Sequence, residues 1–205
     1  MTTSFNRTRR LTSWVLSLGL LAPAVLWAQN PAADTASISK VRISTTLGDI
    51  EAELYADKAP KTVANFVQYV NDKHYDGTIF HRVIPGFMVQ GGGYDAQYRE
   101  KKTRAPVAHE GRQALAAGLK NTPGTLAMAR TNDPQSATAQ FFINVVDNAF
   151  LDPSFQSFGY TVFGKVTSGM DVLQKIRNTP TGAGGPFPTD VPRTPVVIQT
   201  ITLLK

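Results

Sequence analysis

One apolar segment that contains very few polar side chains constrains the fold of this chain more than any other feature. It reads FHRVIPGFMVQGGG over residues 80–93, and Pro85-Gly86 divides it into two short halves that alternate only partly. Two strands of this kind would present four side chains beside one cleft: Arg82, Phe87, Met88 and Gln90. The segment therefore predicts a site that binds an apolar ligand with few polar contacts. The alternative interpretation is an ordinary barrel strand whose arginine extends along the surface.

Alternating apolar and polar residues predict strands along most of the chain after residue 40. Residues 41–45 alternate in this way, and so do residues 50–54 after the turn at Gly48, which predicts a hairpin with one buried face. Further strands are expected at residues 78–83, 87–90, 125–129, 140–145, 162–166 and 196–204. Residues 94–123 and 179–195 are rich in glycine, proline and charge, and we expect them to form long loops.

Two helices are expected. Pro60 suits the first turn of a helix, Asp57 supplies an acidic group at its entry, and apolar residues recur at i, i+3, i+4 and i+7 from Val63. This helix should end by residues 76–77, and the second is expected within residues 169–177. Many strands with two separated helices favour a mainly β fold closed into an antiparallel barrel, because closure removes unpaired strand edges.

Composition excludes several classes of function. The length of 205 residues fits one domain. The chain has 21 basic and 15 acidic residues, and the excess falls to +3 without the three arginines among the first ten residues, which gives no indication of nucleic-acid binding. Because there is no cysteine, disulfides, thiolate metal ligands and a cysteine nucleophile are excluded. No HExxH, GxSxG or phosphate-binding motif occurs, so we expect no metal, no other cofactor and no hydrolase chemistry.

The N-terminal segment has the anatomy of a secretory signal peptide. A basic head ends at Arg9-Arg10, an apolar run follows, and Ala28 precedes polar residues. We expect cleavage most simply after Ala28, with sites after Ala24 or in residues 31–33 as alternatives. A transmembrane anchor is the rival interpretation, but the run is short for one. The expected organisation, with no stable membrane insertion after cleavage, is a signal peptide at 1–28, a flexible tail at 29–39 and one domain at 40–205.

Five segments in a fixed order resemble the cyclophilin family of peptidyl-prolyl cis-trans isomerases. They read FHRVIPGFMVQGG from residue 80, GTLAMART from 124, SATAQFFIN from 136, FLD from 150 and FGYTVFGKV from 158. The resemblance extends from about residue 40 to the C-terminus, and the chain looks most like the periplasmic cyclophilins of Gram-negative bacteria. It implies a closed eight-stranded antiparallel β-barrel capped by two α-helices, a ligand groove on the outer surface, and a monomeric periplasmic enzyme.

The resemblance also implies roles for individual residues. Arg82 matches the catalytic arginine, a permanent donor for the prolyl nitrogen or its neighbouring carbonyl, and Gln90 matches the glutamine that helps orient arginine and substrate. Four apolar residues match the pocket for the proline ring: Phe87, Met88, Phe142 and Leu151. Without the resemblance, core packing would be the preferred interpretation of all four.

The peptide on either side of the proline is expected to lie along a second set of residues. Arg130 matches the residue whose backbone pairs with the peptide as a short strand, with Ala129 and Thr131 beside it on the groove wall, and its side chain is expected to matter little. Gln140 matches a polar residue of the groove. A strand-end amide satisfied by its own neighbours is the alternative interpretation of Gln140.

Phe150 and Tyr160 depart from the best-known eukaryotic pattern, which has a tryptophan that contacts cyclosporin and a histidine that lines the proline pocket. We therefore expect weak cyclosporin binding but unimpaired isomerase activity. His81 adjoins the catalytic arginine and should face the other way along its strand, as a hydrogen-bonded core histidine rather than a general base. His74 and His109 fall in loop-like contexts.

Two functions of different kinds are consistent with these residues. One is an enzyme that accelerates rotation about X-Pro bonds in unfolded or partly folded exported proteins, acting on proline-containing polypeptides. The other is a periplasmic chaperone that holds proline-containing segments with incidental catalysis. Arg82 favours the enzyme, because a pure binder has no need of a charge at the bond that twists.

Overall fold

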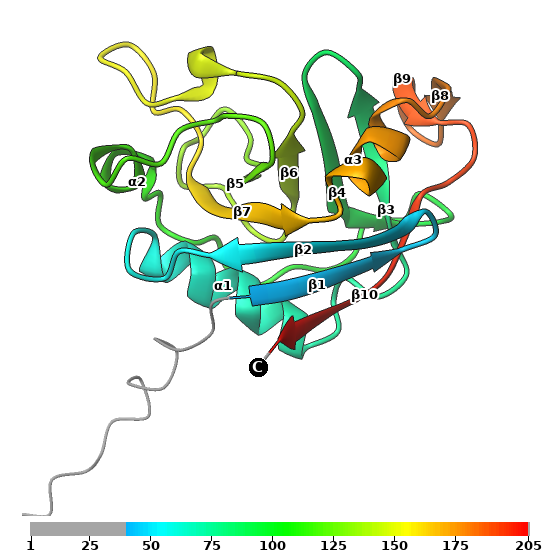
Figure 1. The fold of residues 1–205 in the computed structure, drawn as a ribbon, viewed down its shortest axis with the longest axis horizontal. Coiled ribbons are helices and arrows are strands. Elements are labelled where there is room, and N and C mark those ends of the chain that lie inside the picture. Colours follow the sequence, from blue (N-terminus) through cyan, green and yellow to red (C-terminus); the bar gives the residue numbers. More distant parts are fainter. Residues whose placement is uncertain (1–39, 205) are drawn as a thin grey trace, which may run out of the picture. The chain divides into compact units, whose positions relative to one another are not determined.

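The computed structural model describes residues 40–204, which form a closed β-barrel (Figure 1). Eight strands pair antiparallel in the order β1-β10-β3-β4-β6-β5-β7-β2. They are β1 (Lys40–Thr45), β2 (Gly48–Leu54), β3 (Thr78–Ile84), β4 (Met88–Asp95), β5 (Thr125–Met128), β6 (Phe141–Asn144), β7 (Val162–Ser168) and β10 (Val197–Leu204). The predicted mainly β barrel is confirmed, whereas the expected signal peptide at 1–28 and tail at 29–39 lie outside the described residues.

The barrel closes around an interior built from alternate residues of its strands. On β1 the inward residues Val41, Ile43 and Thr45 are buried, while the residues between them face outward. Helix α1 (Pro60–Asn71) inserts Phe66 among three aromatic rings whose centroids lie 5.1 to 5.5 Å away: Tyr75, Phe141 and Phe163. The apolar face of α1 is therefore held by the barrel interior, as tilted and edge-to-face ring contacts allow.

The first turn of α1 is capped by a residue from a distant segment. Its N-cap residue, Ala59, offers no side-chain hydrogen bond. The buried carboxylate of Glu110 instead accepts hydrogen bonds from the backbone N–H groups of Lys61 (3.0 Å) and Thr62 (2.8 Å). A carboxylate here satisfies N–H groups that have no partner inside the helix. The expectation that Asp57 supplies this acidic group is wrong, because the cap comes from 48 residues beyond Thr62.

Both expected helices are present. Helix α3 (Met170–Arg177) lies within the predicted range, and it buries Val172, Leu173 and Ile176. Helix α1 ends at Asn71, before the expected limit at residues 76–77, and the chain then turns through Lys73, whose φ is 55°. Within residues 40–204, no helix is both long enough and apolar enough to span a membrane.

Two segments expected to be long loops contain short regular elements. Residues 94–123 include α2 (Gly111–Ala116), and residues 179–195 include a hairpin of β8 (Thr181–Gly184) and β9 (Phe187–Pro192). Helix α2 has only six residues, too few for a helical period to appear in the sequence. The described domain therefore has one α-helix more than the two that were expected.

The β8–β9 hairpin is held by aromatic contacts with the barrel. Phe187 stacks on the ring of His81 with centroids 5.3 Å apart and meets the edge of Tyr94 at 5.1 Å. At the hairpin turn, Gly184 and Gly185 lie so close to Tyr98 that a Cβ at either position would overlap its side chain. Because these partners lie about 90 to 110 positions apart in the sequence, no local pattern indicates the hairpin.

Candidate active site

A second apolar cluster lies on the other side of the strands from the barrel interior. Its buried members are Met88, Ala127, Phe142, Leu151 and Val162. Their strand neighbours Val89, Leu126 and Phe141 belong to the interior instead. Because successive side chains of a strand point to opposite faces, the cluster covers the outer face of the barrel.

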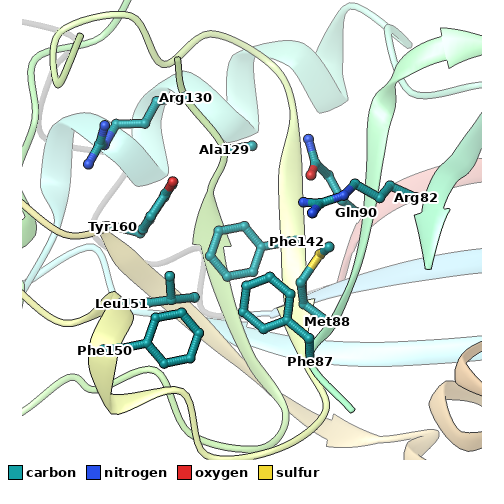
Figure 2. A pocket seen from close by; sticks show the side chains of 10 residues that line it. All are labelled: Arg82, Phe87, Met88, Gln90, Ala129, Arg130, Phe142, Phe150, Leu151 and Tyr160. Carbon is teal, nitrogen blue, oxygen red and sulfur yellow. The ribbon is translucent and has the colours of Figure 1, made fainter. Parts of the chain in front are cut away.

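A cavity of about 340 Å³ opens on this outer cluster, and Figure 2 shows the side chains around it. Ten of the twelve predicted site residues line the cavity: Arg82, Phe87, Met88, Gln90, Ala129, Arg130, Phe142, Phe150, Leu151 and Tyr160. Arg82 and Gln90 lie on one side of it, and Leu151, Phe150 and Tyr160 lie on the other, with Phe142 between them. The remaining two predicted residues, Thr131 and Gln140, line a neighbouring cavity.

Strand pairing places the residues on the first side of the cavity, which we call the strand wall (Arg82, Met88, Gln90 and Phe142). Arg82 of β3 pairs with Gln90 of β4, and Gln90 pairs in turn with Phe142 of β6. Side chains of directly paired residues emerge on the same face of a sheet. Arg82 on β3 therefore lies at one end of a cross-strand row. The ring of Phe142, which forms the pocket floor, lies two strands away from it on β6.

A β-bulge turns Arg82 outward. Phe80 pairs with Gly91 and Arg82 pairs with Gln90, so β3 advances two residues where β4 advances one, and His81 is the extra residue. Without the bulge, Phe80 and Arg82 would point to the same face. With it, Phe80 is fully buried in the barrel interior while Arg82 is exposed on the outer face. This bulge explains why the segment alternates only partly in the sequence.

The guanidinium of Arg82 has no partner within residues 40–204. No carboxylate, carbonyl or side-chain oxygen of the described chain accepts a hydrogen bond from it. The neighbouring amide is already engaged, because Gln90 Nε2 donates to Gln140 Oε1 at 3.0 Å. Gly93 leaves the space that the Gln140 side chain fills, since a Cβ there would lie 2.6 Å from it. The donors of Arg82 are therefore directed to solvent beside the apolar cavity.

The opposite side of the cavity, which we call the loop wall, consists of Phe150, Leu151 and Tyr160. The first two belong to a 3₁₀ turn (Ala149–Leu151), and Tyr160 lies in the segment that precedes β7. Tyr160 N–H donates to Leu151 C=O at 2.9 Å, and the Tyr160 ring meets the edge of Phe142 at 5.5 Å. Phe150 stacks on Phe87 at 5.5 Å but is 71% exposed, so it forms the rim of the cavity.

A buried amide network supports the 3₁₀ turn, and sequence reasoning missed it. Asn148 donates through Nδ2 to Asn144 Oδ1 (2.7 Å) and to Phe87 C=O (2.9 Å). Asn144 Nδ2 donates to Asn121 Oδ1, and Asn121 donates through its backbone and side chain to Asp152 Oδ1 at 2.8 Å. Buried amides of this kind are retained where their bonds fix a geometry. The signal available in the sequence was three asparagines within or beside apolar segments.

A second cavity of about 270 Å³ continues from the first, and the two share Gln90, Ala129 and Arg130. Thr131 N–H donates to Ser136 Oγ at 2.9 Å and so has a partner. The backbone N–H and C=O of Arg130, in contrast, have no hydrogen-bond partner among residues 40–204. An extended peptide that crosses the two cavities could pair with these groups as a short strand.

None of the three histidines lines the main cavity. His81 is buried, and burial lowers its pKa to about 4, so it is neutral at physiological pH. Its Nδ1 has no partner among the described residues, so the expected hydrogen bond is missing at that atom. His74 lies in the turn after α1, as expected, but is buried there, and burial lowers the pKa values of both His74 and His109. Residues 40–204 also contain no group of three or more histidine, aspartate and glutamate side chains arranged to hold a metal ion.

These features define an apolar pocket on the outside of a closed barrel, beside the guanidinium of Arg82, whose donors have no partner among residues 40–204. Comparison with known proteins identifies the class. The family model described as "Cyclophilin type peptidyl-prolyl cis-trans isomerase/CLD" matches residues 40–203. The chain belongs to this family, which confirms the enzyme class expected from the sequence.

Several relatives are similar to this chain over nearly their whole length. Peptidyl-prolyl cis-trans isomerase B of Escherichia coli is 51% identical over 166 residues, which cover 80% of this chain and 98% of the relative. Peptidyl-prolyl cis-trans isomerase A of Dickeya dadantii is 50% identical over 180 residues, covering 88% and 92%. A crystal structure of a Cryptosporidium parvum cyclophilin type isomerase superposes with a TM-score of 0.63 at 27% identity, covering 82% of this chain and 98% of that one.

Proposed function

We propose that this isomerase accelerates rotation about X-Pro bonds while exported proteins fold, and that Arg82 does so by stabilising the twisted amide. The observation that carries the proposal is the guanidinium of Arg82, which has no partner within residues 40–204 and lies in a cross-strand row with Gln90 and Phe142. A chaperone that only holds proline-containing segments would gain from the apolar cavity but not from this cation. The arrangement therefore favours catalysis over holding.

The chemistry follows from the electronic structure of the peptide bond. Resonance makes the C–N bond partly double and sets a barrier of about 18–20 kcal/mol. Twisting removes that resonance, so the prolyl nitrogen becomes pyramidal and basic. A donor directed at this nitrogen binds the twisted state more strongly than either planar state, which is the condition for catalysis. No nucleophile, proton transfer or cofactor is needed.

Each of the two cavities binds a different part of the substrate. The ring of the proline occupies the main cavity on Phe142, Met88 and Phe87, where burying it requires no polar partner. The residues that precede proline extend over the second cavity and pair with the backbone of Arg130, near the Gln90–Gln140 amide pair. A related crystal structure from Cryptosporidium parvum, 27% identical with a TM-score of 0.62, was determined in the presence of the dipeptide Ala-Pro, which is consistent with a substrate of this class.

The cellular part of the proposal rests on the N-terminal sequence. A basic head, an apolar run and a small residue at Ala28 support export to a bacterial periplasm with removal of the leader. There the mature protein would act as a monomer on unfolded or partly folded polypeptides. Cyclosporin should bind weakly, because Phe150 lacks the indole N–H of the eukaryotic tryptophan.

Refolding of a protein whose slow phase is limited by X-Pro isomerisation tests the enzymatic part. The slow phase takes tens to hundreds of seconds without catalyst. Catalytic amounts of the mature wild type should accelerate it, and Arg82→Lys should retain less activity because a lysine ammonium lacks the planar fork. If equimolar rather than catalytic amounts are needed, and Arg82→Lys is as effective as the wild type, the protein acts as a holding chaperone.

Intact-mass measurement on protein from the envelope fraction tests the export. The account predicts a mature N-terminus between residues 25 and 34. A mass that retains the apolar run would identify a membrane-anchored protein and would contradict the cleaved leader.

A further inference from the structure

We propose that Arg130 is a positioning residue, whose side chain holds the loop wall of the proline pocket in place. The inference deepens the proposed function and rests on it, because it assumes that the proline ring occupies the main cavity. It also departs from the expectation that the side chain of Arg130 matters little. Figure 2 shows the Arg130 guanidinium directed toward Tyr160, away from Arg82 and Gln90.

The guanidinium of Arg130 is engaged on all sides. Its Nε and Nη2 donate to the carbonyl oxygen of Gly159 at 3.0 and 2.8 Å, and Nη1 donates to Thr131 C=O at 2.8 Å. The guanidinium carbon also lies 4.5 Å from the centroid of the Tyr160 ring. Two hydrogen bonds that converge on one carbonyl oxygen, combined with a cation over an aromatic ring, require the planar fork of arginine. Arg130 is therefore not an exposed peptide-binding charge but a connection between the end of β5 and the loop wall.

Gly159 is the point at which this connection acts on the loop. Its φ is +62°, and a Cβ there would lie 2.4 Å from Pro153 N and 2.7 Å from Leu151 O. Only glycine allows the chain to pass so closely over Leu151. Arg130 makes the two shortest hydrogen bonds to the carbonyl oxygen of Gly159, and His109 Nε2 lies 3.3 Å from the same oxygen. The peptide group that carries this carbonyl also carries the N–H of Tyr160, which donates to Leu151 C=O at 2.9 Å. Arg130 thus holds the peptide group that joins Gly159 to Tyr160 and, through it, the contact between Tyr160 and Leu151.

The Tyr160 ring depends on the same contact. It is held between the Arg130 guanidinium on one side and the edge of Phe142, 5.5 Å away, on the other. Within residues 40–204, no hydrogen bond fixes its hydroxyl group. Removal of the guanidinium would therefore free the ring to leave the pocket wall, while the strand wall, held by the barrel ladder, would be unchanged.

The kinetic consequence distinguishes positioning from catalysis. The loop wall contacts the proline ring in the planar and twisted states alike, so its loss weakens both and raises KM with little change in kcat. Loss of the Arg82 donor, in contrast, affects the twisted state and lowers kcat. A merely structural role for Arg130 would lower the melting temperature and leave KM of the folded protein unchanged.

A variant series on the full mature protein tests the inference, with X-Pro peptide kinetics, thermal melting and the amide NMR signals of Gly159 and Tyr160 as readouts. We expect Arg130→Ala to raise KM about tenfold with kcat within about twofold of wild type. It should also shift the Gly159 and Tyr160 amide signals. Arg130→Lys should give a KM between those of the wild type and Arg130→Ala, because a lysine keeps the charge over the ring but not the planar fork.

Arg112→Ala is the matched control. Arg112 donates to Ser154 C=O of the same loop at 3.1 Å but does not line the cavity. Its removal should leave KM and both amide signals unchanged. If Arg130→Ala leaves KM and these signals as they are in the wild type, or if Arg112→Ala reproduces its effect, the inference is overturned. If instead the wild type does not turn over X-Pro peptides, or Arg82→Ala is as active as wild type, the proposed function fails, and the amide signals still decide whether Arg130 holds the loop.

Discussion

The two walls of the pocket differ in what holds them. The strand wall takes its positions from backbone ladders, with Arg82, Gln90 and Phe142 in one cross-strand row. The loop wall has no such ladder. It is held by an asparagine network beneath the 3₁₀ turn and by the fork of Arg130 on Gly159 above it.

This difference is consistent with the roles that we propose for the two walls. A charge that must meet a twisting bond needs a position that does not relax, and a central strand of a closed barrel provides one. A wall that only encloses an apolar ring tolerates more adjustment, and side-chain bonds suffice for it. We therefore expect changes behind the strand wall to act on stability or kcat, and changes in the loop wall to act on binding.

Acid should weaken the strand wall through His81, the bulge residue behind Arg82. Its pKa is lowered from 6.5 to about 4 in the folded protein, chiefly by burial. Folding therefore disfavours protonation, so the stabilising contribution is complete above about pH 6.5 and is lost as the pH falls toward 4. The free energy of unfolding should decrease by about 3 kcal/mol over this window, which urea titrations at pH 7 and pH 4 would measure.

His81→Phe provides the control for acid sensitivity. Phenylalanine keeps a ring against Phe187 and removes a buried Nδ1 that has no partner among the described residues. At pH 7 the free energy of unfolding of the variant should equal or exceed that of the wild type. Between pH 7 and pH 4 it should decrease much less than that of the wild type. A small dependence of the free energy of unfolding on pH will remain, because burial also lowers the pKa values of His74 and His109. An unchanged slope in His81→Phe would assign the acid sensitivity to other groups.

Gly159→Ala should damage the loop wall without reaching the strand wall. Alanine would be held at φ +62° with its Cβ against backbone atoms, so residues 151–160 must shift. We expect KM for an X-Pro peptide to rise by about 30- to 100-fold, or about 2 to 3 kcal/mol, with a smaller change in kcat. Gly118→Ala is the control, because Gly118 also has a positive φ (+87°) but no atom within 4 Å of an added Cβ. It should lose stability and keep its KM; equal kinetics in both variants would show that the path of the loop does not matter.

Phe150→Trp, at the rim of the loop wall, should have the smallest effect of these substitutions. The indole adds one N–H donor and more ring area at a side chain that is 71% exposed, so an added hydrogen bond there gains only about 1 kcal/mol. Cyclosporin should inhibit this variant about fivefold more tightly, while turnover of a small X-Pro peptide stays within about twofold. Inhibition titrations on both proteins in one isomerase assay measure the two effects. Equal inhibition constants would mean that Tyr160 or the groove loops set the affinity for the drug.

The barrel was predictable because its strands carry their own periodicity. The alternation of β1 and β2 and the apolar stripe of α1 are local patterns, and each formed where it was expected. The β8–β9 hairpin and the Glu110 cap of α1 were not predictable in the same way. Both depend on partners far along the chain, such as Phe187 with His81, that only the closed barrel brings together.

The residues of the site came from the family resemblance, but their arrangement did not. Sequence spacing alone would place Phe80 and Arg82 on the same face, and the bulge at His81 reverses this. The hydrogen bonds from Arg130 to Gly159 join residues 29 positions apart and depend on the backbone conformation of a glycine, so no sequence motif predicts them. What remained hidden was thus the set of contacts between segments that are not neighbours in the sequence.

The central claim is that Arg82 acts on the twisting bond and not on binding. Exchange NMR of an X-Pro peptide at saturating protein measures the cis-trans rate on the enzyme separately from the dissociation constant. We expect Arg82→Ala to lower the on-enzyme rate by about two to three orders of magnitude, the effect of losing one transition-state donor, while the dissociation constant changes by only a few fold. An on-enzyme rate within a few fold of wild type, with the loss confined to the dissociation constant, would contradict the account.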